Sequence, residues 1–282
     1  MRWTRGYRSR HTIDRRGDPV ADGRGVSPMG LVMLARLLPR LGWKGMLLVA
    51  VAVAVFWALG GGGLFSGAPV GTGPTPTGTD DPAAFVSFVL DDTQATWERV
   101  FTERGARYEP AELVLFSKGT QSACGYGASE VGPFYCPADR RVYIDLSFYD
   151  DLARRYGAPG DFAEAYVIAH EIGHHVQRLR GELAGTPARG ATNVSVAMEL
   201  QADCYAGVWA RSAADRGLVE PGDLEEGIRA ASAVGDDRLQ EAQTGRVRPE
   251  TFTHGTAEQR SGWFRRGYEA GTPEACNTSG GS

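Results

Sequence analysis

The chain has 282 residues, of which 42% are hydrophobic and 23% charged, and this allows one sizeable domain with appendages. The net charge of −4 hides an asymmetry, because residues 1–44 carry ten Arg and Lys against three Asp, a net charge of +7 that leaves −11 for the rest. A basic arm of this kind can bind nucleic acid. An apolar segment follows it directly, so the positive-inside rule of membrane proteins explains the charge more simply, and we expect no nucleic-acid partner.

Residues 45–65 contain no charged side chain. A helix of this length, at 1.5 Å per residue, spans the ~30 Å hydrocarbon core of a bilayer. A cleaved signal peptide is the alternative, but the long basic arm and the lack of a small-x-small cleavage site favour a retained anchor. The sequence therefore predicts a single-pass protein of the cell membrane, with residues 1–44 as a cytoplasmic arm, 45–65 as a transmembrane helix and the rest outside the cytoplasm.

A linker rich in Gly, Pro and Thr at 66–82 leads into a domain that we expect to cover residues 83–282. Apolar residues recur at helical spacing in several stretches of this domain, and two short stretches have the pattern of strands. We expect an α+β fold, mostly helical, with a small sheet beside the active-site helix. The predicted strands lie at 112–116 and 141–145, and the predicted helices at 84–103, 146–155, 161–180, 192–214, 223–243 and 258–268.

The helix predicted at 161–180 contains the motif His170-Glu171-x-x-His174. Two histidines four residues apart lie on one helix face about one turn apart, so both imidazoles can reach one metal ion. Glu171 follows the first histidine, where it can take a proton from a metal-bound water. This arrangement suits peptide-bond hydrolysis with Zn²⁺, which polarises the carbonyl. The alternative is a buried helix with structural histidines. It is disfavoured by the context, in which Asp161 and Glu164 have capping-box spacing before an apolar stripe.

A catalytic zinc usually has three protein ligands, and no third histidine follows at the short metzincin spacing. Glu199 and Asp203 are four residues apart and share a helix face. Glu199 lies 25 residues after His174, which is enough for a loop and a returning helix. We assign Glu199 as the third ligand and Asp203 as a hydrogen-bond acceptor for a ligand histidine. A solvated helix face is the alternative, and the apolar residues around this pair argue against it.

These motifs resemble those of the bacterial membrane-anchored neutral zinc metallopeptidases. The resemblance covers roughly residues 83–278 and implies a gluzincin-like zinc protease domain, zincin-like in fold, whose pattern also favours Glu199 as the third ligand. It implies no particular substrate. The stretches that carry the resemblance lie in order at 124–125, 132–137, 142–145, 170–177, 199–204, 252–255, 258–260 and 263–264, with Cys276 near the end.

Two further histidines lie near the motif or the end of the domain. His254 precedes the helix predicted at 258–268, and a histidine brought near the zinc from outside the motif could donate a hydrogen bond to the developing oxyanion. A structural histidine that caps or packs the last helix is an equal alternative. His175 points about 100° around the helix from His174, so we expect it to make packing contacts or to support a ligand residue, and not to bind the metal itself.

The four cysteines are Cys124, Cys136, Cys204 and Cys276, and all lie beyond the predicted anchor. If that side is outside the cytoplasm, disulfides are allowed, and three pairings exist. Cys124 and Cys136 bracket a Gly-rich loop and are the natural local pair, which leaves Cys204 with Cys276. The alternatives are free buried thiols and a second metal site, for which the C-x-x-C spacing is missing.

Together these features predict a membrane-anchored, zinc-dependent endopeptidase that acts on proteins or peptides, with Glu171 as general base and then as proton donor to the leaving amine. The first alternative is a non-catalytic, membrane-tethered zinc-binding or scaffold protein. The presence of Glu171 weighs against it, because zinc affinity alone does not require that residue. A cytoplasmic nucleic-acid binder that uses the basic arm is a third alternative.

Overall fold

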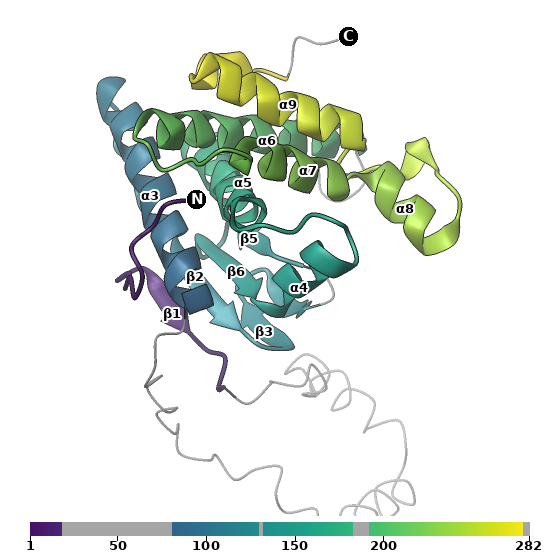
Figure 1. Ribbon diagram of the computed structural model, residues 1–282, viewed down its shortest axis with the longest axis horizontal. Helices are drawn as coiled ribbons and strands as arrows, with labels where there is room; N and C mark the ends of the chain where they lie inside the picture. The colour runs from purple at the N-terminus through teal and green to yellow at the C-terminus, as the bar shows by residue number, and fades with distance from the viewer. Residues whose placement is uncertain (19–80, 130–131, 183–191, 279–282) are drawn as a thin grey trace, which may run out of the picture. The chain divides into compact units, whose positions relative to one another are not determined.

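A four-stranded sheet lies beside a layer of helices in the computed structural model, which describes residues 1–18, 81–129, 132–182 and 192–278 (Figure 1). The strand order is β1 (Thr12–Asp14), β2 (Glu112–Phe116), β6 (Arg141–Asp145) and β5 (Phe134–Cys136). β1, β2 and β6 are parallel, whereas β5 is antiparallel to β6. A separate antiparallel hairpin joins β3 (Gly119–Ser122) to β4 (Gly125–Ala128).

The sheet buries both of its faces. Alternate residues of β2 divide between two clusters: Leu113 and Leu115 join the main core, whereas Val114 and Phe116 join a smaller cluster on the opposite face. Period-two alternation explains this division, because successive side chains of a strand point to opposite faces. The sheet is thereby fixed against the helices, with β5 and β6 packed against the helix that carries the H-E-x-x-H motif.

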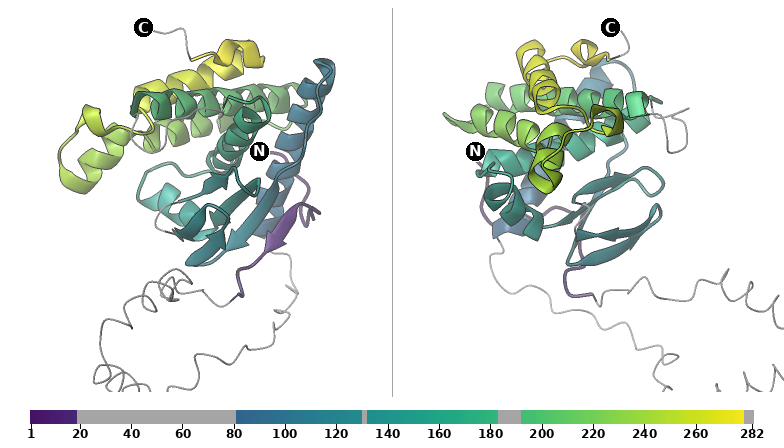
Figure 2. Two further views of the ribbon diagram at one scale, coloured as in Figure 1. Left: turned by 180° about the vertical axis from the view of Figure 1, so that it is seen from behind. Right: turned by 90° about the vertical axis from the view of Figure 1, so that its right-hand side faces the viewer.

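That helix, α5 (Asp161–Leu179), is buried over most of its length and packs against α3 (Asp81–Glu103), α6 (Thr192–Asp215) and α7 (Asp223–Ala233). Green and yellow helices from α5 onward lie on one side of the sheet when it is seen from behind and from the side (Figure 2). α6 in turn packs against α9 (Ala257–Ala270). The remaining helical segments in the described residues are α4 (Ser147–Arg154), α8 (Asp236–Thr244) and the short 3-10 turns Pro249–Thr251 and Pro273–Cys276.

Close contact between α5 and α6 depends on a glycine. A methyl group on Gly173 would lie 2.9 Å from the carbonyl oxygen of Ala202, which is too close for a real Cβ. The absence of a side chain therefore allows the two helix backbones to approach each other at this point. Because Gly173 lies one residue before His174 and Ala202 one residue before Asp203, this crossing brings the two halves of the predicted metal site together.

The first eighteen residues belong to the same compact unit as the domain, whereas the sequence predicted a separate arm over 1–44. β1 pairs in parallel with β2, and the ring of Trp3 makes an edge contact with Phe85 of α3. The amino group of Met1 is buried and lies 2.9 Å from a carboxylate oxygen of Asp161 and 3.2 Å from one of Asp223. These ion pairs join the starts of α5 and α7.

One part of the predicted fold class is wrong. The α+β architecture agrees with the structure, but no helix among the residues described is long and apolar enough to cross a membrane. The predicted transmembrane segment at 45–65 lies outside the described residues, as does the linker up to residue 80. A single span between residues 18 and 81 would separate two parts of the chain that pack together here. Hydropathy and length alone do not register such long-range packing.

Most of the predicted helices and both predicted strands are confirmed, with ends that differ by a few residues. The helix predicted at 223–243 is instead two, α7 and α8. The break lies at Gly235, where a methyl group would come within 2.3 Å of the backbone nitrogen of Ala257. β1, β5 and the β3–β4 hairpin were not predicted from the sequence, because strands of three or four residues carry little periodic signal.

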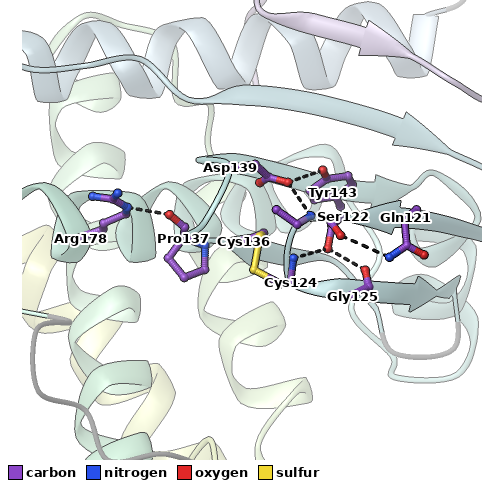
Figure 3. Close-up of a disulfide and its surroundings, with 10 residues drawn as sticks. Gln121, Ser122, Cys124, Gly125, Cys136, Pro137, Asp139, Tyr143 and Arg178 are labelled. Carbon is purple, nitrogen blue, oxygen red and sulfur yellow. Dashed lines mark hydrogen bonds between the residues drawn. A yellow bond between two sulfur atoms is a disulfide. The ribbon is translucent and has the colours of Figure 1, made fainter. Parts of the chain in front are cut away.

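Both predicted disulfides are confirmed, Cys124–Cys136 and Cys204–Cys276. The first ties the β3–β4 hairpin to β5, and Figure 3 shows it beside Ser122, whose hydroxyl donates to the carbonyl of Gly125. The same view shows Arg178 of α5 donating to the carbonyl of Pro137, which follows Cys136. This side of the sheet is thus anchored to the motif helix.

Candidate metal centre

The motif helix begins differently from the sequence prediction. Its N-cap is Gly160, which has no side-chain cap, so the capping box predicted for Asp161 and Glu164 does not form. Asp161 instead binds the amino group of Met1. A complete capping box is found at the start of α9, between Thr256 and Gln259. The negative charges of Asp161 and Glu164 in the first turn of α5 still stabilise the helix, because they interact favourably with the positive end of its dipole.

Three side chains from α5 and α6 converge on one point. His170 Nε2 lies 3.1 Å from one carboxylate oxygen of Glu199, and His174 Nε2 lies 3.5 Å from the other. Potential ligand atoms of all three residues lie within 4.8 Å of one another. Two ligand atoms bound to a tetrahedral zinc at about 2.0–2.1 Å are about 3.3 Å apart. The spacing of these donors therefore fits a zinc ion.

Hydrogen bonds on the opposite ring edges set the tautomer of both histidines. His170 Nδ1 donates to Asp203 Oδ1 at 2.8 Å, and His174 Nδ1 donates to the side-chain oxygen of Gln177 at 2.9 Å. A carboxylate and an amide oxygen only accept hydrogen bonds, so the proton of each ring lies on Nδ1. The lone pair of each Nε2 then faces the point of convergence, as metal binding requires.

The histidine partner Asp203 is itself held by a buried network. Its side chain has no exposed surface, and Arg260 of α9 donates to it from Nε at 2.8 Å and from Nη2 at 3.0 Å. The hydroxyl of Tyr166 also donates to Asp203. Burial would raise the pKa of this carboxyl, but Arg260 and His170 lower it below its ordinary value. Asp203 is therefore held ionised, as an acceptor for His170.

A second network holds the partner of His174. The side-chain nitrogen of Gln177 donates to the carbonyl of Met198 at 2.6 Å and to Gln201 at 2.9 Å. Gln201 in turn donates to the carbonyl of Cys276 at 3.1 Å. Both amide groups are buried, and their orientation directs the oxygen of Gln177 toward His174. The ring of His174 is thus connected to the Cys204–Cys276 disulfide.

Sequence reasoning did not single out Arg260, Tyr166 or Gln177. Gln177 and Arg260 lie inside stretches that carried the family resemblance, at 170–177 and 258–260, and that was the available signal. Tyr166 lies within the helix predicted at 161–180, where its ring fits the apolar stripe. This residue is one helical turn before His170, so its hydroxyl could be expected near the groups that surround this histidine.

Electrostatics at the convergence point favour a bound cation. Burial lowers the pKa of His170, yet Asp203 and Glu199 together raise it to about 10. Burial likewise raises the pKa of Glu199, and the neighbouring His174 and His170 lower it well below its ordinary range. Charges in a buried place require partners of opposite sign. At neutral pH the ring of His170 is therefore protonated on both nitrogens, with Nε2 directed at Glu199, and a metal ion bound at this point would replace the proton on Nε2.

His175 is placed as the sequence predicted, away from this point. Its Nε2 donates to the carbonyl of Glu109 at 2.6 Å, and the hydroxyl of Tyr135 donates to its Nδ1 at 2.8 Å. Burial lowers the pKa of this imidazole to about 4, so the ring is neutral. His175 therefore joins α5 to β5 and to the chain before β2.

His254 lies on the loop before α9, with 48% of its side chain exposed. Its Nδ1 is 3.2 Å from Asp236, a carboxylate that also accepts the backbone N–H groups of residues 253–255. A methyl group on the next residue, Gly255, would lie 3.2 Å from Val196 and 3.3 Å from Leu200, which flank Glu199 in α6. Within the described residues, no contact joins His254 to His170, His174 or Glu199. Its catalytic role therefore stays a prediction.

A second acidic cluster has a different occupant. Asp161, Asp223 and Glu226 have oxygens near enough to one another to hold an ion, but the amino group of Met1 already binds the first two. Burial opposes the charge of this amino group, yet Asp161 and Asp223 raise its pKa above the ordinary value. This cluster is therefore an ammonium site within the fold.

Two histidines of a H-E-x-x-H helix and a glutamate from a second helix make a donor set that some catalytic zinc sites use. A family model described as "Putative neutral zinc metallopeptidase" matches residues 1–279, and the chain belongs to this family. The match extends to the first residues, beyond the 83–278 inferred from the motifs alone. Membership at this level implies a zinc-dependent hydrolase of peptide bonds.

Two similar relatives have no assigned function. The chain is 45% identical over 297 aligned residues to the uncharacterized protein YpfJ of Escherichia coli strain K12, and the alignment covers all of both chains. It is 47% identical over 184 residues to the uncharacterized protein Rv2575 of Mycobacterium tuberculosis strain H37Rv, covering 61% of this chain and 63% of the relative. No solved structure matches the chain.

Proposed function

We propose that the protein is a zinc-dependent endopeptidase that uses His170, His174 and Glu199 to hold the metal. The observation that supports this most directly is the convergence of these three donors, with both histidines fixed in the tautomer that presents Nε2. Zinc bound there would polarise the scissile carbonyl and increase the acidity of the attacking water. The substrate class that this chemistry fits is a protein or peptide.

Glu171 supplies the proton transfers of the proposed reaction. Its side chain is buried next to His170, and it does not take part in the donor set around the metal position. Its carboxylate accepts a proton from the attacking water and then delivers it to the nitrogen of the leaving amine. Zinc binding alone would not require a carboxylate at this position, so Glu171 favours catalysis over a scaffold role.

His254 is proposed to stabilise the developing oxyanion. Its Nδ1 can accept from the Thr253 hydroxyl at 2.9 Å, and in that tautomer the ring proton lies on Nε2, which can donate a hydrogen bond. A methyl group on Gly255 would come within 3.2 Å of Val196 and 3.3 Å of Leu200, so this part of the loop lies close to the helix of Glu199. A donor directed at the developing charge stabilises the transition state more than the bound substrate.

We also infer that the domain works in an oxidising compartment outside the cytoplasm. Two disulfides support this, because such bonds persist where thiols are not continuously reduced. Cys124 and Cys136 are twelve residues apart in the chain and Cys204 and Cys276 seventy-two, so both short and long loops are closed.

The test is Glu171→Gln in the full chain, which removes the base and leaves the proposed ligands in place. We expect about one zinc per chain in both proteins by elemental analysis, and a loss of about 10²–10⁴-fold in cleavage of an unstructured protein substrate by the variant. Full activity in the variant would reject Glu171 as the base. A wild-type protein that holds zinc but cleaves no peptide bond would support the scaffold alternative.

A further inference from the structure

A chain of side-chain amides runs from His174 to the turn Pro273–Cys276. Gln177 accepts from His174 Nδ1 at 2.9 Å and donates to the side-chain oxygen of Gln201 at 2.9 Å. Gln201 donates in turn to the carbonyl of Cys276 at 3.1 Å, across 75 residues of sequence. Gln177 and Cys276 have no exposed surface, and Gln201 is buried as well. One buried line of hydrogen bonds therefore joins α5, α6 and this turn.

Backbone carbonyls fix the direction of each hydrogen bond in this chain. A carbonyl oxygen only accepts, so the side-chain nitrogen of Gln201 faces Cys276 and its oxygen faces Gln177. The nitrogen of Gln177 also faces the carbonyl of Met198 at 2.6 Å, which turns its oxygen toward His174. With an acceptor on that side, Nδ1 of His174 carries a proton, and Nε2 is the ring nitrogen that can bind a metal.

A disulfide holds the far end of the chain. Cys276 is bonded to Cys204, which lies three residues after Gln201 on α6 and so on a neighbouring part of the same helix face. The bond keeps the Cys276 carbonyl beside the side chain of Gln201. Without it, the turn could separate from α6, and Gln201 would lose the acceptor that orients its amide. A buried amide that loses a partner is costly, so its neighbours would rearrange.

We propose that Gln177 and Gln201 are positioning residues for His174, and that the Cys204–Cys276 disulfide strengthens zinc binding through them. This inference rests on the proposed zinc site and extends it, because it gives the turn after α9 a part in holding the metal. Neither glutamine binds the metal, and both act through the ring of His174. Buried hydrogen bonds in a chain polarise one another, so the loss of one link weakens the others.

The first measurement is the zinc affinity of the full chain, by competition with a chromogenic chelator. Gln177→Met keeps the length of the side chain and removes the acceptor, so zinc should bind about 10–100-fold more weakly. Gln201→Met should cost only severalfold, because Met198 still holds Gln177. Cys204→Ala combined with Cys276→Ala should show the same loss as Gln201→Met. Unchanged zinc affinity in Gln177→Met would overturn the proposal.

Two comparisons separate this route from a general loss of stability. Cys124→Ala combined with Cys136→Ala removes the other disulfide, which lies outside the chain of amides, and should keep the zinc affinity. The second comparison is a double-mutant cycle, in which the Cys204–Cys276 bond is removed from the wild type and from Gln201→Met. We expect a severalfold loss in the wild type and no further loss in Gln201→Met. Equal losses in the two backgrounds, or an equal loss without the Cys124–Cys136 bond, would overturn the route.

Cobalt(II) in place of zinc gives a readout that stability alone does not change, because its visible absorption depends on the arrangement of its ligands. We expect shifted bands in Gln177→Met and bands like those of the wild type in the Cys124–Cys136 variant. Wild-type bands in Gln177→Met would reject the positioning role even if zinc affinity fell.

The same measurements distinguish this inference from the proposed function. A wild-type chain that binds no zinc would reject the proposed metal site, and this inference with it. A wild-type chain that binds zinc and cleaves peptides, with the affinity unchanged in Gln177→Met, would reject the positioning role and leave the endopeptidase standing. Thermal unfolding of each metal-free variant checks that the protein is folded.

Discussion

At the scale of single residues, the two acidic side chains of α6 have different surroundings although they are one turn apart. Glu199 faces the Nε2 atoms of both histidines, whereas Asp203 faces the Nδ1 edge of His170 and is surrounded by Arg260 and Tyr166. Spacing alone left either residue able to reach the metal. Glu199 is placed to bind the proposed metal directly, whereas Asp203 orients the ring of His170.

This difference predicts unequal losses of zinc. Glu199→Ala should purify largely free of metal, because a direct donor is lost. Asp203→Asn should bind zinc about 10–100-fold more weakly, because the ring of His170 loses its charged partner. Competition with a chromogenic chelator measures both affinities. Asp215→Asn, an exposed carboxylate at the end of the same helix, is the control and should bind zinc as the wild type does. A greater loss in Asp203→Asn than in Glu199→Ala would exchange the two roles.

Glu164 predicts a pH-dependent cost to stability. Its pKa is raised from 4.5 to about 7 in the folded protein, so between these values the folded state holds a proton that the unfolded state has lost. Stability therefore falls as pH rises from about 4.5 to about 7, and stays lower above that. The difference corresponds to about 3 kcal/mol as an upper bound, since the side chain is partly exposed.

Glu164→Gln removes this titration. We expect thermal unfolding to show a higher midpoint for the variant than for the wild type at pH 8, and no such gain at pH 4.5, where the wild-type carboxyl is also neutral. An equal gain at both pH values would show that ionisation is not the cause.

At the scale of the helices, the metal site depends on how closely α5 and α6 cross. Two of the three proposed ligands come from α5 and the third from α6, so a change in helix separation changes the distance between donors. The contact between Gly173 and Ala202 sets that separation. Packed helices resist extra atoms at such a point, because the interior has no free volume to receive them.

Gly173→Ala should therefore weaken both the fold and zinc binding. The added methyl group would force α5 and α6 apart, with a loss of about 1–3 kcal/mol in the free energy of unfolding, and zinc affinity should fall with it. Gly262→Ala in α9 is the control, because nothing lies within 4 Å of its added methyl group. There a gain of about 0.5–1 kcal/mol is expected from helix propensity. Urea unfolding and chelator competition measure the two effects, and a Gly173 variant with unchanged zinc affinity would contradict this account.

At the scale of the whole molecule, local patterns were readable from the sequence and long-range contacts were not. The motif helix, the helix of Glu199 and the Cys124–Cys136 disulfide follow from spacing within short stretches, and Cys204–Cys276 follows from that pair by elimination. Arg260 reaches Asp203 from fifty-seven residues away, and only the fold brings the two together. The break between α7 and α8 depends in the same way on a contact between Gly235 and Ala257, which no periodicity reveals.

The first residues of the chain illustrate the same limit. Charge and hydropathy set residues 1–44 apart from the domain, yet Met1–Asp18 is part of its packing. A three-residue strand and a few ion pairs have no periodic signature in the sequence. These residues stabilise the domain only through contacts with β2 and with the starts of α5 and α7, which lie about a hundred residues or more further along the chain.

Non-covalent contacts hold the N-terminal segment, residues 1–18, to the rest of the domain. Arg5 pairs with Asp81 at 2.8 Å, so the N-terminal segment is held to the start of α3 by a contact that needs no covalent link between them. A chain cut once between residues 18 and 81 would keep its first piece docked, as the β1–β2 pairing and the ion pairs of Met1 remain. We therefore expect a cut in the backbone there to divide the chain and to leave the fold around the proposed metal ligands intact.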